Sequence, residues 1–238
     1  MSGHSKWKNI MHKKEKTDAQ RASVFTKIGK EISMAVRDGG PDPNSNSKLR
    51  DLIAKAKQNN VPNDNIDRII KKASGNDAVA YDDIFYEGYG PGGVAVIVEA
   101  STDNRNRTAS DIRHYFDKFG GNLGATGCVS FMFADKGVIV IENDGLDEDK
   151  FMEDALDSGA VDFTSDSEVF EVFTDPSELE GVKSALSERG YAFLSAEVEK
   201  IPSTYVRLDE ENAVKMQKLL DHLEENDDAI NVWHNWDE

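Results

Sequence analysis

The stretch GVAVIVEASTDNRNRTASDIRHYFDKFGG, residues 93–121, contains a change of hydrophobic period. Residues 94–98 form a continuous apolar run, which is typical of a buried β-strand. Apolar side chains then recur at three- and four-residue spacing up to Gly120, which predicts a helix with Thr108 as its N-cap. This part of the chain is therefore predicted to be a strand followed by a helix.

The same order recurs further along the chain. The pattern predicts strands over 129–133, 138–141, 168–173, 191–198, 204–208 and 229–233, and helices over 147–157, 175–189 and 210–224. We interpret residues 135–201 as a complete ferredoxin-like βαββαβ domain. Residues 79–134 and 202–238 each hold half of such a set, so we predict one split ferredoxin-like domain with the other domain inserted in it, Pro202 marking the return.

The first part of the chain has a helical pattern. Apolar stripes at three- and four-residue spacing occur within 25–36, 49–56 and 66–73. Such short amphipathic helices must bury their stripes against each other or a neighbour, so residues 1–78 are predicted to form a basic arm and a small helical domain. The expected fold class is α+β: a three-helix domain with a basic arm, followed by two ferredoxin-like domains, one inserted in the other.

Charge is unevenly distributed along the 238 residues. The formal net charge is −17, yet residues 1–75 hold 16 Lys and Arg against 8 Asp and Glu, and the rest holds 12 against 37. This asymmetry favours a polyanionic partner for the first part of the chain. The alternative is a solvated surface of random sign.

Residues 2–21 form the basic arm, with six Lys and Arg against Glu15 and Asp18. Lysines here would neutralise phosphates, and Trp7 would either stack on a base or pack on the helical domain. The predicted nucleic-acid-binding residues are Lys6, Trp7, Lys8, His12, Lys13, Lys14, Lys16, Arg21 and Lys27.

A second candidate site is the run Asn104, Arg105, Asn106 and Arg107. Its two arginines stand at the N-terminus of a helix, where the helix dipole disfavours cations. In one interpretation they form, with the free N–H groups of the helix, a site for an anion or for a partner's carboxylate. In the other they pair with acids of a neighbouring domain. The sequence favours neither interpretation over the other.

Catalytic and cofactor signatures are not apparent. The glycine run at 88–93 precedes a strand, whereas a dinucleotide-binding loop follows one. Cys128 is the single cysteine, and the histidines show no HExxH spacing. We expect no enzyme activity, no metal and no cofactor. No apolar run has the length of a membrane span and no secretory h-region is present, so we expect a cytoplasmic protein without membrane contact, monomeric rather than an obligate oligomer.

Several motifs resemble the YebC/PmpR family: SGHSKWKNI at 2–10, YEGYGPGGVAVIVE at 86–99, DNRNRT at 103–108 and GGNLG at 120–124. The resemblance covers essentially the whole chain. It implies a three-domain, non-enzymatic protein of the kind described as DNA-binding transcriptional regulators. Mitochondrial relatives are translational activators of cytochrome oxidase synthesis, so a ribosome-associated factor that binds ribosomal RNA is the alternative.

The helices expected around 59–62 could form a helix-turn-helix, the usual reader of DNA bases. Asp64 and Asp67 would then lie where the recognition helix meets the groove, which favours contact with the phosphate backbone over base readout. A third hypothesis is a metal-dependent enzyme that uses the acidic part of the chain. It predicts stabilisation by magnesium, manganese or zinc.

Overall fold

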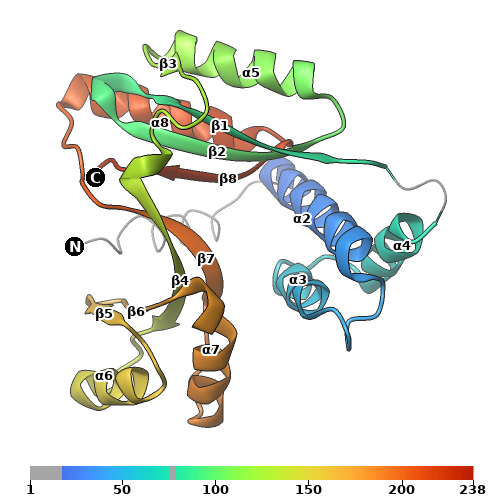
Figure 1. The fold of residues 1–238 in the computed structure, drawn as a ribbon, viewed down its shortest axis with the longest axis vertical. Helices are drawn as coiled ribbons and strands as arrows, with labels where there is room; N and C mark the ends of the chain where they lie inside the picture. The colour runs from blue at the N-terminus through green and yellow to red at the C-terminus, as the bar shows by residue number, and fades with distance from the viewer. Residues whose placement is uncertain (1–17, 76–78, 238) are drawn as a thin grey trace. The chain divides into compact units, whose positions relative to one another are not determined.

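The computed structural model describes residues 18–75 and 79–237. It begins with α2 (Asp18–Gly39), α3 (Ser47–Gln58) and α4 (Asn63–Ala73). Both shorter helices pack against α2 (Figure 1), and the three predicted apolar stripes form one core. The buried Asn46 side chain caps α3 and donates hydrogen bonds to the carbonyl oxygens of Ala35 and Gly40, both at 2.8 Å, which fixes the turn after α2.

The first sheet has the strand order β3-β1-β2-β8, and all its strand pairs are antiparallel. Its strands are β1 (Asp82–Tyr89), β2 (Ala95–Thr102), β3 (Asn122–Leu123) and β8 (Ala229–His234), with a short 3-10 turn (Pro91–Gly93) between β1 and β2. Helices α5 (Arg105–Lys118) and α8 (Glu210–Glu225) cover one face of this sheet (Figure 1). The C-terminal strand thus completes a sheet that begins at residue 82.

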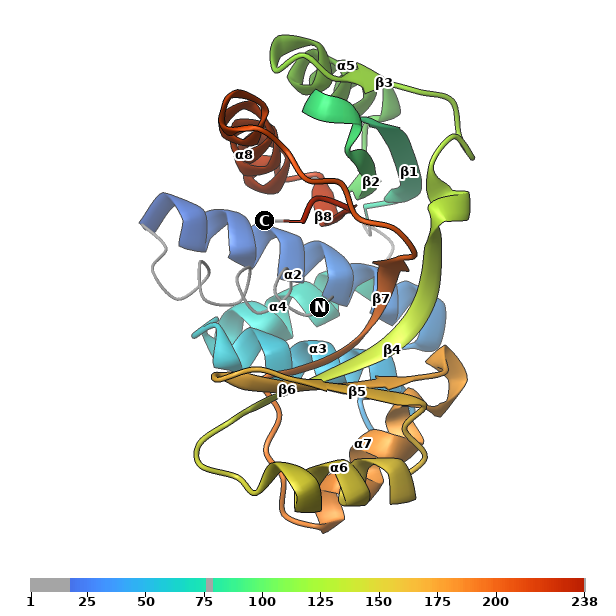
Figure 2. The ribbon, with the colours of Figure 1, turned by 90° about the vertical axis from the view of Figure 1, so that its left-hand side faces the viewer.

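The second sheet has the order β5-β6-β4-β7 and is also antiparallel, which is the ferredoxin-like order. Its strands are β4 (Phe133–Glu142), β5 (Asp162–Ser165), β6 (Val169–Thr174) and β7 (Ser195–Pro202). Helices α6 (Glu148–Asp157) and α7 (Leu179–Glu188) cover one face (Figure 2), where Phe151 stacks on Phe170 with ring centroids 4.9 Å apart.

The described chain divides into two compact units, one of residues 131–205 and one of residues 18–75, 79–130 and 206–237. The predicted α+β fold class is confirmed. A helical region comes first and two antiparallel sheets follow, and the strands of the second sheet lie in sequence between β3 and β8 of the first. The proposed domain limits at residues 78, 134 and 201 stay predictions. Within the described residues, no helix is both long and apolar enough to span a membrane.

Several local predictions were wrong. Strands β1, β3 and β5 were missed, and most of the strand expected over 129–133 is absent, since Ser130–Met132 form a 3-10 turn and β4 begins only at Phe133. Helix α5 begins at Arg105 and is capped by Asn104, because the Thr108 hydroxyl is buried and bonds elsewhere. The strand expected over 191–198 lies at Ser195–Pro202 instead, since Tyr191 is held in the preceding loop by a 2.6 Å hydrogen bond to Asp154. In place of a strand over 204–208, the described chain has a single bridge between Val206 and Trp236.

Candidate nucleic-acid interface

Helices α3 and α4 present cations to solvent. Together they carry seven Lys and Arg against three Asp and Glu. Six of these cations are exposed, namely Lys48, Arg50, Lys57, Arg68, Lys71 and Lys72. Within residues 18–75 and 79–237, Lys48, Lys57, Lys71 and Lys72 make no ion pair. These ammonium groups are available to a polyanion.

Helical spacing groups these cations on the sides of the helices that face away from the core. On α4, Arg68, Lys71 and Lys72 are separated by three and four residues, so they are neighbours on one surface. On α3, Arg50 and Lys57 lie two turns apart with the exposed Ala54 between them. The buried positions Leu52 and Ile66 hold the opposite sides of the two helices in the core.

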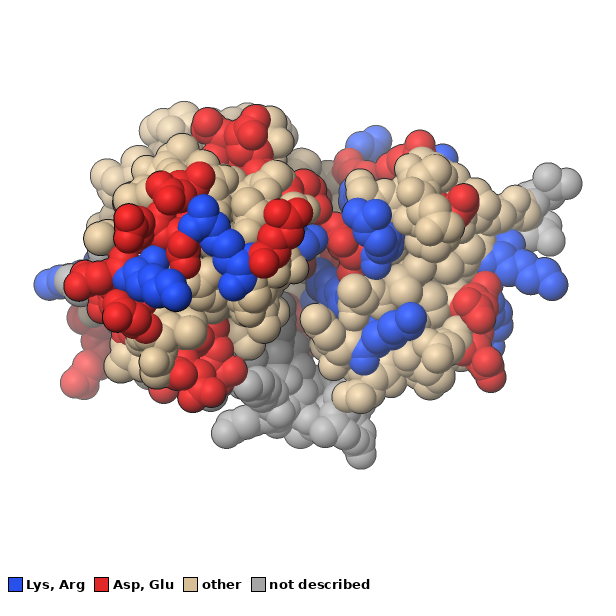
Figure 3. Space-filling model, turned by 90° about the horizontal axis from the view of Figure 1, so that it is seen from below, with Lys and Arg blue, Asp and Glu red and all other residues tan. Residues whose placement is uncertain are grey.

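The two compact units differ in charge. Residues 131–205 hold 5 Lys and Arg against 19 Asp and Glu. In Figure 3 the lobe with α6 and α7, on the left, shows many red acidic side chains. The lobe with α3 and α4, on the right, shows blue side chains spread over its surface. A polyanion would therefore meet attraction on α3 and α4 and repulsion at residues 131–205.

Two lysines of α2 are directed away from this surface. Lys27 donates to the carbonyl oxygen of Glu224 at 2.5 Å, at the C-terminus of α8, where a cation complements the helix dipole. Lys30 donates to the carbonyl oxygen of Asp227 at 3.0 Å and pairs with the Asp228 carboxylate at 2.5 Å. The predicted role of Lys27 in nucleic-acid binding stays a prediction, and its described contact is with the turn between α8 and β8.

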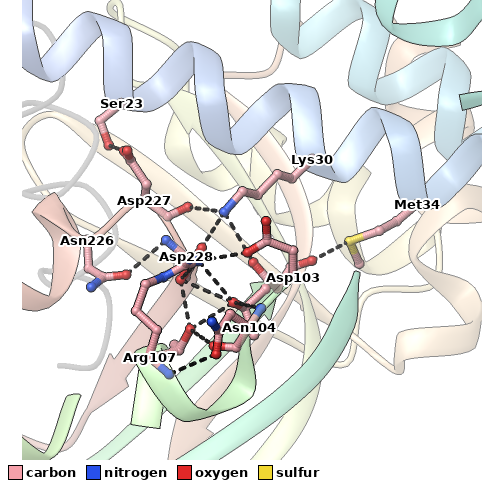
Figure 4. A network of polar contacts seen from close by, with 12 residues as sticks. Ser23, Lys30, Met34, Asp103, Asn104, Arg107, Asn226, Asp227 and Asp228 are labelled. Atoms are coloured by element: carbon pink, nitrogen blue, oxygen red, sulfur yellow. Dashed lines mark hydrogen bonds and ion pairs between the residues drawn. The ribbon is translucent and has the colours of Figure 1, made fainter. Parts of the chain in front are cut away.

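Asp228 is the centre of a buried polar network (Figure 4). Its side chain is 7 % exposed, and it accepts hydrogen bonds from Lys30, from Arg107 at 2.8 Å and from the Thr108 hydroxyl at 2.7 Å. Thr102 donates a longer bond of 3.2 Å. Residues from α2, β2, α5 and the α8–β8 turn thus meet at one carboxylate, which links the helical domain to the first sheet.

The pKa of Asp228 reflects two opposing effects. Burial raises the pKa of a carboxyl group, but the hydrogen bonds from Lys30, Arg107 and Thr108 outweigh burial and lower the pKa of Asp228 to about 2. Hydrogen bonds to Asp228 and to Asp103 in turn raise the pKa of Arg107. The carboxylate is therefore ionised at every physiological pH.

The run Asn104 to Arg107 forms the first turn of α5 and its cap. Asn104 accepts a hydrogen bond from the backbone N–H of Arg107 at 3.1 Å, and Asn106 is exposed. Arg107 pairs with Asp103 and Asp228. Arg105, with a side chain that is 66 % exposed, lies 3.6 Å from the Asp82 carboxylate. Both arginines have acidic partners in the first sheet domain itself, which the sequence pattern did not identify; the anion or partner role stays a prediction.

Most of the predicted arm lies outside the described residues. These are Lys6, Trp7, Lys8, His12, Lys13, Lys14 and Lys16. Arg21 belongs to α2, but its side chain also lies outside the described part. Of the other predicted residues, Lys27 contacts the C-terminus of α8, and Asn104, Arg105, Asn106 and Arg107 lie at the start of α5. The structure adds the exposed cations of α3 and α4 to these candidates.

Glu87 is a buried carboxylate that the sequence pattern did not single out. It accepts hydrogen bonds from the backbone N–H groups of Gly127, Val129 and Ser130 at 2.8, 2.9 and 2.8 Å. Burial would raise the pKa of Glu87, and these bonds lower it below its ordinary value. Glu87 thus holds the loop after β3 against β1, while the neighbouring Cys128 has a pKa raised by burial and by Glu87.

Potential metal ligands are scattered over the fold. Among the side chains that the structure describes, no group of three or more His, Cys, Asp and Glu is arranged to hold a metal ion.

Comparison with known proteins places this interface in a family. Residues 5–76 match the TACO1/YebC protein N-terminal domain, and residues 81–236 match the TACO1/YebC second and third domain. The chain belongs to the TACO1/YebC family. This confirms the resemblance to YebC proteins, and the N-terminal match includes α3 and α4 together with most of the arm.

Relatives in the TACO1/YebC family cover the full chain. A protein of Caldicellulosiruptor bescii is 58 % identical over 240 residues, with 100 % of this chain and 99 % of the relative covered. One of Acetivibrio thermocellus is 59 % identical over 239 residues, with 99 % of each chain covered. Both carry the name probable transcriptional regulatory protein. A crystal structure of a conserved hypothetical protein from Aquifex aeolicus is 45 % identical, with a TM-score of 0.85 over 93 % of this chain and 92 % of that one.

Proposed function

We propose that this TACO1/YebC-family chain is a non-enzymatic, cytoplasmic regulator of gene expression that binds nucleic acid, and that it acts on DNA as a transcriptional regulator. The observation that carries the proposal is the set of exposed cations on α3 and α4, four of which make no ion pair within the described residues. The names of the relatives from Caldicellulosiruptor bescii and Acetivibrio thermocellus support a regulatory role.

The cations support contact with phosphates more than with bases. Lysines bind phosphates as point charges and release counterions, which gives affinity without sequence information. Asp64 and Asp67 are exposed at the start of α4, where a recognition helix would meet base edges. Any preference for particular DNA sequences therefore arises from DNA shape or from the arm.

The test is the salt dependence of binding in a charge variant. Replacing Arg68, Lys71 and Lys72 with Gln should weaken binding to duplex DNA and reduce the slope of log affinity against log salt by up to about 0.9 for each phosphate that the variant no longer neutralises. The control variant replaces three cations outside the helical domain with Gln, namely the exposed Arg207 and Lys218 and the half-buried Lys215. Since both variants lose the same charge, equal effects on affinity would contradict a specific role for α4.

A ribosome-associated translation factor is the second candidate. The exposed Asp64 and Asp67 at the start of α4 disfavour the reading of bases. Contact through backbone and shape, which does not need base readout, suits folded RNA as well as DNA. Crosslinking the protein to nucleic acid in cells and sequencing the attached fragments distinguishes the two. Enrichment of DNA fragments supports the transcriptional role, and predominance of ribosomal RNA supports the translational role.

A further inference from the structure

Helix α6 carries exposed apolar side chains on one of its sides. Met152 and Leu156 are 39 % and 49 % exposed, and they are neighbours because they lie one helical turn apart. Phe151 and Ala155, each one position earlier, are buried in the core of the second sheet domain. The apolar part of α6 is therefore wider than the part that this core covers.

The exposed side of α6 faces away from α7 and lies beside β5. Helix α7 lies over β4 and β7, and Arg189 at its C-terminus pairs with Asp154 on the opposite side of α6. Glu148 precedes Met152 by four residues and so shares the exposed side. The Ser165 hydroxyl at the end of β5 donates a 2.5 Å hydrogen bond to Glu148. This contact places the exposed side of α6 along β5.

Strand β5 forms an edge of the second sheet. Among the described strands it pairs with β6 alone, so the backbone groups of its outer edge have no strand partner there. The rings of Phe151 and Phe163 have centroids 5.6 Å apart, which places α6 over β5 (Figure 2). The exposed side of α6 thus projects beyond this edge. We define the α6–β5 margin as the outer edge of β5 with Met152, Leu156 and the 55 % exposed Val161.

Carboxylates border the α6–β5 margin. Asp149 and Glu153 are exposed on α6, each three residues before one of the exposed apolar side chains, Met152 and Leu156. Within residues 18–75 and 79–237, neither carboxylate makes a hydrogen bond or an ion pair. Asp162 adds an exposed carboxylate on β5. The red side chains of this lobe in Figure 3 belong to the same acidic domain. A ligand that fits the margin is therefore apolar and cationic together.

We propose that the α6–β5 margin binds an extended segment of a partner protein that contains both apolar residues and Lys or Arg. The segment adds to the second sheet as a strand beside β5, and its backbone pairs with the outer edge of β5. Its apolar side chains contact Met152 and Leu156 under the projecting side of α6. Its cationic side chains reach the carboxylates of Asp149, Glu153 and Asp162, while their stems cover apolar surface.

The chemistry of the margin argues against other occupants. Its carboxylates repel the phosphates of a nucleic acid. A second copy that paired through its own β5 would bring the same acids together, and like charges on facing strands are destabilising. Helices α3 and α4 of a second copy are cationic, but none of their described residues is an exposed large hydrophobic one. The proposal concerns other residues than the cations of α3 and α4, so it does not depend on the proposed function.

Hydrogen–deuterium exchange of the full chain tests the docking. The probe is a short synthetic peptide of alternating Leu and Lys. It should slow exchange of the backbone N–H groups of β5 several-fold and leave β7, the other edge of the same sheet, unchanged. Matched peptides of alternating Leu and Glu, or of alternating Ser and Lys, should have no effect, because each lacks one of the two properties that the margin requires.

Two variants connect the protection to named side chains. Replacing Met152 and Leu156 with Ser should weaken peptide binding by about tenfold or more, because the apolar contact is lost. The control variant replaces Val79 and Val214, which are 40 % and 56 % exposed in the other compact unit, with Ser and should bind as the wild type does. Circular dichroism and thermal melting check that both variants are folded.

A charge variant and two competing ligands complete the test. Asp149→Asn with Glu153→Gln keeps the shape and should also weaken binding. Unchanged exchange of β5 with the Leu and Lys peptide would overturn the proposal, and so would equal slowing by the Ser and Lys peptide, because charge alone would then account for binding. Protection of β5 that rises with protein concentration would assign the margin to a second copy. Protection by a duplex oligonucleotide would assign it to nucleic acid, and either result refutes the proposal.

Discussion

The Asp228→Asn variant tests how the helical domain is joined to the first sheet. Lowering the pKa from the ordinary value of 3.8 to about 2 corresponds to about 2.5 kcal/mol of stability from the ionised form. Asn keeps the shape but removes the charge that faces Lys30 and Arg107. Breaking a buried ion pair from one side costs about 3–5 kcal/mol. We therefore expect a loss of about 2.5–5 kcal/mol at pH 7.

Urea unfolding and thermal melting measure this loss. For a domain of this size, 1 kcal/mol corresponds to about 2–4 °C, so the melting temperature should fall by at least about 5 °C. The matched control is Asp227→Asn. Asp227 is exposed, accepts a 2.8 Å hydrogen bond from Ser23 that Asn can also accept, and offers Lys30 only its backbone carbonyl. Its effect should stay within about 0.5 kcal/mol.

The pH dependence provides an independent check. Because the pKa of Asp228 is lowered in the folded state, its contribution is fully present above about pH 4 and is lost as the pH falls towards about 2. The stability difference between the wild type and Asp228→Asn should shrink over the same range. If the two variants at 227 and 228 unfold alike at pH 7, the reasoning about the buried network is refuted.

Three other predictions concern local structure. Arg107→Ala should lower the melting temperature more than Arg105→Ala, because only Arg107 supports the buried Asp228; equal melting temperatures would contradict this. Glu87→Gln should accelerate modification of Cys128 by a thiol reagent at pH 8, since loss of the carboxylate lowers the thiol pKa, and an unchanged rate would count against it. Gly88→Ala should cost about 1–3 kcal/mol in urea unfolding, because its Cβ would lie 2.5 Å from the Asn122 carbonyl oxygen, whereas Gly181→Ala in α7 meets open space and should be neutral or stabilising.

Periodic apolar patterns were sufficient for most of the helices and for the central strands. The stripes of α2, α3 and α4 and the continuous apolar run of β2 each reflect burial that the residues themselves specify. Strand β1 could not be found this way. Its sequence DDIFYEGY mixes polar and apolar residues, and its helix-facing position Gly88 is small because the Phe116 ring and the Asn122 backbone approach closely.

The candidate interface was predictable in charge but not in geometry. Composition showed that cations gather in the first 75 residues, yet it could not show which of them face solvent. Lys30 is directed inward because Asp228, which is 198 residues away in sequence, lies beside it in the fold. Asn104 illustrates the same limit, since its role as the cap of α5 depends on where the preceding strand ends.

The central claim is that the basic arm and helical domain bind nucleic acid through phosphates. The most direct measurement compares the affinity of the full chain and of the chain without residues 2–16 for the same oligonucleotide over a range of salt concentrations. The account predicts weaker binding on deletion. It also predicts a slope of log affinity against log salt that is flatter, for each phosphate no longer neutralised, by about 0.9 on duplex DNA or about 0.7 on a single strand. Identical affinity and slope in the two chains would contradict it.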